Sequence, residues 1–208
     1  MTDEKLKIIQ KYIEYVCEKK NFPFRNDFLD YLGAEELNFK NNFTSMPYLQ
    51  EKIWLFFLSQ TLTELDDSQE YRDYSARNKM LAFYFTFFEK ISGYRDYFKF
   101  CFKNTNILTK YPNSFKVFKP EFKEYAKTLL TEGKTTGELA DRKFLNSGFE
   151  KLFWTNFISV LHFWFKDTSE DLQKTDALIE KSIHFTFDLA SPLPIDSAVS
   201  LVKFLIKH

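Results

Sequence analysis

The chain has little of the material from which tight turns are made, because its 208 residues include only five glycines and six prolines. A sandwich or barrel of many short strands needs a turn about every 8–12 residues, often built on one of these two residue types. Such folds are therefore disfavoured. Long helices joined by few connections fit the composition better, and we expect an all-α fold.

Cysteine and histidine are scarce as well. The two cysteines, Cys17 and Cys101, are too few for a disulfide framework, and with three histidines they offer no metal-ligand spacing. We therefore expect no metal and no other cofactor, and a reducing cytoplasm as the setting of the protein.

An excess of charge of either sign is also absent, since 29 Lys and Arg stand against 29 Asp and Glu. No global positive field attracts nucleic acid or an anionic membrane, so any such partner must meet a local patch. No uncharged apolar run approaches the roughly 18 residues of a spanning helix, and residues 1–20 carry charges throughout, unlike a secretory signal. We expect a cytoplasmic protein with no membrane partner.

Motifs of enzyme active sites are missing too: there is no glycine-rich phosphate loop, no nucleophile elbow and no His-Glu-x-x-His pattern. His162 and His184 lie in apolar helical stretches, where a histidine is more often a hydrogen-bonded interior or interface residue than a catalyst. Either could instead meet a polar group of a ligand. We expect the protein not to be an enzyme.

Aromatic residues are abundant, with 26 Phe, 11 Tyr and 3 Trp. Such rings fill ordinary protein cores, which is the simpler interpretation, and they also form the walls of roomy apolar cavities. Both interpretations stay open from composition alone.

Apolar residues recur at helical spacing in the N-terminal region. Residues 5–19 predict a first helix, and residues 24–32, closed by Gly33, predict a short second one. Residues 35–42 predict a third helix, and a fourth begins at Ser45 and runs to about Leu65. This layout, with a tight glycine turn between the second and third helices, matches a helix-turn-helix DNA-binding unit.

The pattern predicts further helices beyond this unit. They cover residues 69–91, residues 94–103, a stretch ending near Glu132 before a connection at Gly133 and Gly137, and residues 141–165, 171–190 and 195–207. Residues 141–165 carry too many apolar side chains for one stripe, so we expect that helix to face both its own core and something else.

The run Gly33-Ala34-Glu35-Glu36-Leu37-Asn38-Phe39-Lys40-Asn41-Asn42-Phe43 resembles a signature of the TetR/AcrR family of transcriptional regulators, Gly-Val-Ser-x-Gly-Thr-Leu-Tyr-x-His-Phe. Gly33, Phe39 and Phe43 fall on the structural positions of that signature. Phe28-Leu29 and Ser45 through Leu49 fall on its flanking positions without a gap. The resemblance covers about the first 65 residues in motif and the rest of the chain in pattern.

This resemblance implies a TetR-like fold, with a helix-turn-helix DNA-binding domain at residues 1–48 and a helical ligand-binding and dimerisation domain at residues 49–208. Proteins of the family dimerise through their last two long helices, here 141–165 and 171–190, which would account for the apolar surplus of the former. They hold a ligand among the central helices. The candidates on the helix faces here are Phe57, Tyr84, Phe88, Trp154, Phe157 and His162.

The DNA contacts that the resemblance implies come from a locally basic and amide-bearing edge of the head. The candidates are Lys5, Arg25, Asn26, Asn38, Lys40 and Asn41. The DNA-facing positions nevertheless depart from the family pattern, with Glu35 and Glu36 where phosphates come close and Met46 in place of a phosphate-binding lysine.

Residues 1–50 hold seven Lys and Arg against eight Asp and Glu, a net charge of minus one. Neutralised phosphates supply much of the affinity for DNA, so two hypotheses stay open. The first is a TetR-like transcriptional regulator that binds double-stranded DNA as a homodimer and responds to a small hydrophobic or aromatic ligand. The second is a TetR-fold small-molecule or lipid-binding protein that has lost DNA binding.

Overall fold

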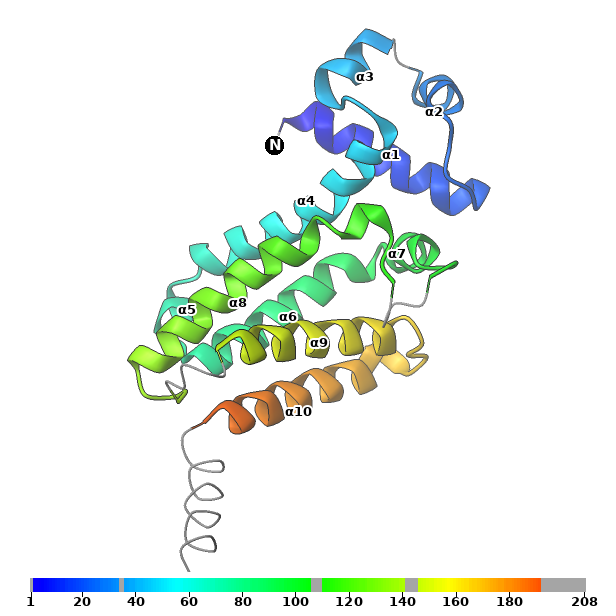
Figure 1. Ribbon diagram of the computed structural model, residues 1–208. Helices are drawn as coiled ribbons and strands as arrows, with labels where there is room; N and C mark the ends of the chain where they lie inside the picture. The colour runs from blue at the N-terminus through cyan, green and yellow to red at the C-terminus, as the bar shows by residue number, and fades with distance from the viewer. Residues whose placement is uncertain (1, 34–35, 106–109, 141–145, 192–208) are drawn as a thin grey trace, which may run out of the picture. The chain divides into compact units, whose positions relative to one another are not determined.

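The computed structural model describes residues 2–33, 36–105, 110–140 and 146–191, and every regular element in these ranges is helical (Figure 1). The helices are α1 (Asp3–Lys19), α2 (Arg25–Leu32), α3 (Glu36–Asn42), α4 (Met46–Asp67), α5 (Gln69–Asp73), α6 (Ala76–Ser92), α7 (Arg95–Cys101), α8 (Phe118–Thr135), α9 (Asn146–Trp164) and α10 (Gln173–Ala190). Two short 3₁₀ turns are η1 (Asn113–Phe115) and η2 (Glu170–Leu172). The predicted all-α fold is confirmed.

The chain forms two compact units. The first consists of Met1–Gln60 and Phe87–Pro120, and the second of Thr61–Thr86 and Glu121–His208. Helices α4, α6 and α8 each pass from one unit into the other along the chain. The domain boundary predicted after residue 48 separates a DNA-binding part from a ligand-binding part. The compact units do not test such a division by function, so this boundary stays a prediction.

The ends of the N-terminal helices follow from local sequence signals. The Thr2 hydroxyl accepts a hydrogen bond from the Lys5 backbone N–H at the start of α1, and the Ser45 hydroxyl accepts one from the Tyr48 N–H at the start of α4. Helix α2 ends at Gly33, whose φ of 63° lies in the left-handed region that glycine adopts at little cost. The first four helices therefore lie where periodicity and capping place them.

The prediction of one helix over residues 69–91 is wrong, because α5 ends at Asp73 and α6 begins at Ala76. Tyr74 between them is extended, with φ −69° and ψ 146°. Two serines act as caps in quick succession: the Ser68 hydroxyl accepts from the Tyr71 N–H, and the Ser75 hydroxyl accepts from the Asn78 N–H. The second cap restarts the helix, so the break comes from hydrogen bonding that apolar periodicity does not register.

The predicted connection at Gly133 also needs correction, since α8 continues through Gly133 to Thr135. A Cβ at Gly133 would lie 2.8 Å from Leu139 Cδ1 and 3.3 Å from the Ala76 Cβ. Glycine is therefore required here for close packing. The turn is made by Gly137, whose φ is 78°.

Helices α9 and α10 lie side by side and run antiparallel (Figure 1). The ring centres of Phe153 in α9 and Phe187 in α10 are 5.2 Å apart. In the connection between the two helices, the Asp167 carboxylate accepts a hydrogen bond from the Thr175 hydroxyl. The predicted helices at 141–165 and 171–190 thus exist over α9 and α10, while residues 141–145 and the helix predicted at 195–207 lie outside the described residues. Most apolar side chains of α9 are buried within the chain itself, so its own core accounts for most of the apolar surplus.

Candidate functional site

The head of the molecule, α1 to α3, is held together by aromatic rings. Phe28 of α2 lies 5.3 Å from the Tyr12 ring of α1 and 6.2 Å from the Phe39 ring of α3, in both cases edge to face. Phe39 in turn lies 6.0 Å from Phe43. All four rings are almost fully buried, so the side chains that carry the family resemblance form the core of the head.

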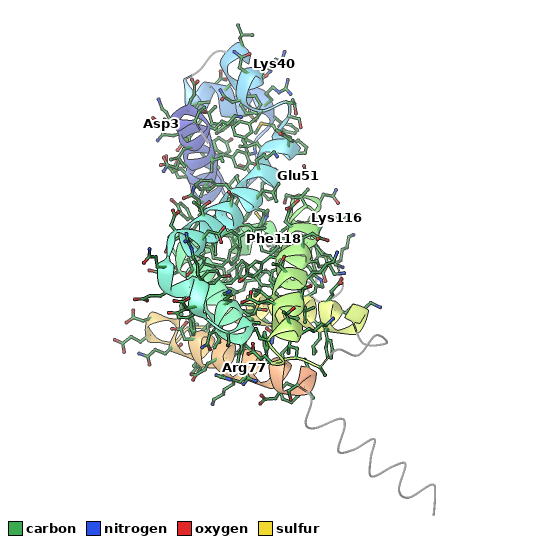
Figure 2. All side chains as sticks on the ribbon, turned by 90° about the vertical axis from the view of Figure 1, so that its left-hand side faces the viewer. Asp3, Lys40, Glu51, Arg77, Lys116 and Phe118 are labelled. Carbon is green, nitrogen blue, oxygen red and sulfur yellow. The ribbon has the colours of Figure 1, made fainter. Side chains whose placement is uncertain are left out.

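The outer face of α3 carries different chemistry. Leu37, Lys40 and Asn41 are spaced three and four residues apart, which places them on one face of the helix, and all three are exposed. Leu37 is 66% exposed. Figure 2 shows where Lys40 lies on α3. This face therefore offers an apolar group, a cation and an amide to a partner.

The remaining DNA-contact candidates are placed in different ways. The Arg25 guanidinium donates to the Thr44 carbonyl at 3.2 Å and lies 5.9 Å from the centre of the Phe39 ring, so it fastens the start of α2 to the end of α3. Asn26 is exposed beside it, and Lys5 is half-buried on α1. Asn38 belongs to α3, but its side chain lies outside the described part of the chain, as do Glu35 and the side chain of Glu36.

Three of the six ligand candidates lie together in the second unit. The Phe157 ring is 5.7 Å from Tyr84 and 6.0 Å from Trp154, and Phe122 adds a ring 4.7 Å from Phe157. We call Tyr84, Phe122, Trp154 and Phe157 the aromatic cluster. The Phe157 ring contacts the other three, so a ligand among them would have to shift these rings.

Tyr84 of this cluster begins a hydrogen-bonded row of three polar side chains, Tyr84, Asn156 and Thr186, which we call the polar trio. The Tyr84 hydroxyl donates to Asn156 Oδ1 at 2.8 Å, and Asn156 Nδ2 donates to the Thr186 hydroxyl at 3.4 Å. Burial raises the pKa of Tyr84 well above its usual range, so the hydroxyl stays protonated. Sequence reasoning missed Asn156 and Thr186, although an amide between Trp154 and Phe157 in an apolar helix was a usable signal.

The other three ligand candidates are Phe57, Phe88 and His162. Phe57 and Phe88 belong to the first unit, where the Phe57 ring packs 5.1 Å from Tyr94 and 5.3 Å from Phe98. His162 is half-buried on α9. Its pKa is lowered first by burial and then by the nearby Lys166, so the neutral ring dominates at neutral pH.

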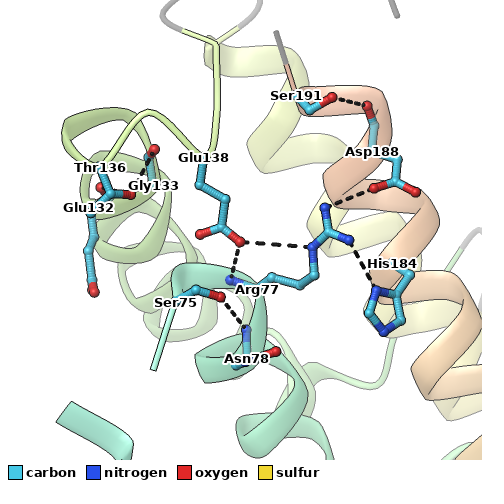
Figure 3. A network of polar contacts seen from close by, with 10 residues as sticks. All are labelled: Ser75, Arg77, Asn78, Glu132, Gly133, Thr136, Glu138, His184, Asp188 and Ser191. Carbon is cyan, nitrogen blue, oxygen red and sulfur yellow. Dashed lines mark hydrogen bonds and ion pairs between the residues drawn. The ribbon is translucent and has the colours of Figure 1, made fainter. Parts of the chain in front are cut away.

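A polar network fastens α10 to the start of α6 (Figure 3). The Arg77 guanidinium lies 2.8 Å from Asp188 Oδ1, 3.8 Å from Glu138 Oε1 and 3.1 Å from His184 Nδ1. A guanidinium can only donate, so His184 Nδ1 accepts and carries no proton in this arrangement. His184 is thus a hydrogen-bonded structural histidine, as the sequence suggested.

Another face of α10 carries an apolar stripe that the described residues cover only in part. Leu178, Ser182, Phe185 and Leu189 recur every three or four residues and therefore share a face. Phe185 is 62% exposed, and the other three are half-buried. The apolar stripe therefore presents one exposed aromatic ring, Phe185, beside side chains that are partly covered.

No described helix is both long and apolar enough to cross a membrane. Within the same described residues, no three His, Cys, Asp or Glu side chains come together in a way that could hold a metal ion.

Comparison with known proteins gives one positive result. A search of curated proteins found no match. Residues 79–205, more than half of the chain, match the family model described as "Tetracyclin repressor-like, C-terminal domain". The match begins well beyond the residues 33–43 that carry the signature resemblance, so two separate parts of the sequence point the same way. The chain belongs to the tetracycline-repressor-like (TetR) family.

Proposed function

We propose that this protein is a cytoplasmic TetR-type transcriptional regulator that binds double-stranded DNA as a homodimer and responds to a small apolar ligand. The observation that carries the DNA-binding part is the exposed face of α3. In a helix-turn-helix unit the second helix of the pair enters the major groove. There, Lys40 suits the acceptors on guanine, Asn41 suits adenine, and Leu37 suits the thymine methyl group.

The electrostatic contribution to this binding should be small for a DNA-binding head. Residues 1–50 carry a net charge of minus one, and Arg25 already has partners inside the head. We therefore expect few phosphate contacts and a weak dependence of affinity on salt.

An electrophoretic shift assay at low salt, with the DNA that flanks its own gene, tests the proposal. Lys40→Ala should weaken binding about tenfold, because a good side-chain contact to a base contributes about 1–3 kcal/mol. Lys174→Ala, the same change at an exposed position on α10, is the matched control and should bind like the wild type. Absence of binding below micromolar concentration, or equal loss in both variants, contradicts DNA reading by α3.

The ligand response belongs to the aromatic cluster and its polar trio. A molecule that inserts between Tyr84, Trp154 and Phe157 would gain apolar contacts and could replace the hydrogen bond from Tyr84 to Asn156. It would change the affinity for DNA only if it binds the two spacings of the paired heads differently.

Dimerisation would use the stripe of Leu178, Ser182, Phe185 and Leu189 together with the adjoining surface of α9. Two copies of α9 and α10 would then pack as a four-helix bundle about a twofold axis. Such an arrangement covers Phe185 and sets the spacing of the two heads.

The near-neutral head favours a second candidate function, a TetR-fold carrier or sensor of a small molecule or lipid that no longer binds DNA. Native mass spectrometry of the purified protein tests it. A bound small molecule of defined mass, together with a negative shift assay, would support this function. A protein of bare polypeptide mass would leave it without a ligand.

A further inference from the structure

A cleft of about 520 Å³ opens in the second unit, apart from the aromatic cluster. Its walls come from the end of α4, from α5 and α6, and from α8. This volume is within the range of sites that take small organic molecules.

Two tyrosines form a hydrogen-bonded pair in the cleft wall. The Tyr125 hydroxyl donates its only proton to the Lys79 carbonyl at 3.1 Å. The two hydroxyl oxygens lie 3.0 Å apart, so Tyr71 must be the donor to Tyr125. The Tyr71 side chain is largely buried, and its oxygen keeps lone pairs that can accept a hydrogen bond from a guest.

The most buried cation of the cleft is already neutralised. Lys79 is 9% exposed, its ammonium lies 2.5 Å from Glu132 Oε1, and it sits 5.7 Å from the centre of the Tyr71 ring. An anionic guest would have to compete with Glu132 for this charge.

The remaining charges make the cleft negative. Its charged lining residues are Asp66, Glu121, Glu124 and Glu132 against Arg72 and Lys79, a net charge of minus two. Glu124 also forms an exposed ion pair with Lys127, at 3.7 Å, and such a pair contributes little in water. The Arg72 guanidinium donates a hydrogen bond to the backbone carbonyl of Asp66 at 3.1 Å. A cleft with excess carboxylates, a buried acceptor and tyrosine rings favours a cation.

We propose that this cleft binds organic ammonium ions, meaning protonated amines carried on an aromatic or branched apolar body. The N–H groups would donate to Tyr71 and the carboxylates, and the apolar body would lie against Leu62, Leu129 and the tyrosine rings. This site goes beyond the apolar-ligand response proposed above, and it does not depend on DNA binding.

The cleft is also connected to the aromatic cluster by packed rings. Tyr125 lies 4.6 Å from Phe83, Phe83 lies 5.7 Å from Phe122, and Phe122 contacts Phe157. A guest that moves the Tyr125 ring would therefore displace Phe83 and, through it, the rings of the aromatic cluster, because closely packed groups leave no free space between them.

Isothermal titration calorimetry of the full chain, at low ionic strength and neutral pH, tests the proposal. The probes are phenylbutylamine, phenylbutanol and phenylbutyrate, which share one apolar body and differ in the charge of the head group. We expect the amine to bind at least about tenfold more tightly than the alcohol, and the carboxylate most weakly.

Variants locate the site. Glu121→Gln and Glu124→Gln change exposed side chains, which the fold tolerates, and each should weaken amine binding about threefold or more while leaving the alcohol unchanged. Tyr71→Phe should weaken the amine as well. Glu180→Gln, the same charge change at an exposed position on α10, is the control.

Three results would overturn the proposal: no binding of the amine, equal binding of amine and alcohol, or equal loss in Glu180→Gln and the cleft variants. None of them bears on the DNA shift assay, so the two proposals fail separately.

Discussion

At the scale of single residues, Asp167 shows how a buried charge is kept at low cost. One carboxylate oxygen accepts from the Ser169 backbone N–H at 2.9 Å and from the Ser169 hydroxyl at 2.6 Å. The other accepts from the Thr175 N–H at 2.8 Å and from the Thr175 hydroxyl at 2.6 Å. The residue before α10, Leu172, provides no side-chain cap. The Asp167 carboxylate, six residues before the helix begins, caps its first turn instead.

Asp167→Ala should lower the free energy of unfolding by about 2–4 kcal/mol, since hydrogen bonds to a charged group are lost and buried donors are left without a partner. Urea unfolding at neutral pH measures this change. Glu180→Ala, an exposed carboxylate on the same helix, should change stability by less than about 0.5 kcal/mol. Equal stability of the two variants would contradict the capping role.

The same carboxylate predicts a pH dependence. Burial alone would raise the pKa of Asp167, but its hydrogen bonds with Ser169 and Thr175 outweigh burial and hold the pKa well below its usual range. Because the folded pKa is lower than the unfolded value of about 3.9, the stabilisation is complete above that value and is lost as the pH falls through the folded pKa. The difference between wild type and Asp167→Ala should therefore shrink in acid.

At the scale of elements, helices were predictable where one face is apolar and a cap is present. Residues 3–19 and 25–32 follow periodicity and Gly33 closely, because both signals are local in sequence. The break at Ser75 and the continuation through Gly133 were not predicted. The first depends on a second serine cap, at Ser75, that follows the cap at Ser68. The second depends on a contact with Leu139 that forms only after the chain turns back.

Two glycines give a matched test of that contact. Gly133→Ala should destabilise the fold by about 1–3 kcal/mol, because the added methyl group would overlap Leu139. Gly148→Ala in α9 has open space around the new methyl group, and it should stabilise by up to about 1 kcal/mol through helix propensity. Thermal or urea unfolding of both variants measures the contrast, and effects of the same sign would contradict the packing argument.

At the scale of the whole molecule, the apolar stripe on α10 predicts the assembly. Phe185→Glu should weaken the dimer at least about a hundredfold, because a twofold interface contains the change twice and each buried Phe contributes about 1.5–3 kcal/mol. Light scattering after size-exclusion chromatography at micromolar concentration would then give a monomer mass.

Phe24→Glu is the control for this prediction, since Phe24 is 83% exposed and lies just before α2 in the head. It should leave the dimer intact. If the wild type is a monomer, or if both variants dissociate alike, the interface is not the one proposed.

The amino-acid sequence by itself determined the helical class, the helices of the head and the rings that fill its core, because periodicity and caps act over a few neighbouring residues. It also indicated the family through residues 33–43. Three of the six ligand candidates came together, but helix faces could not show which faces meet. Tyr71 and Tyr125 are 54 positions apart along the chain and become partners only when α5 packs beside α8. The tertiary structure alone decided that contact, because a cleft is built from several helices, whereas periodicity describes one helix at a time.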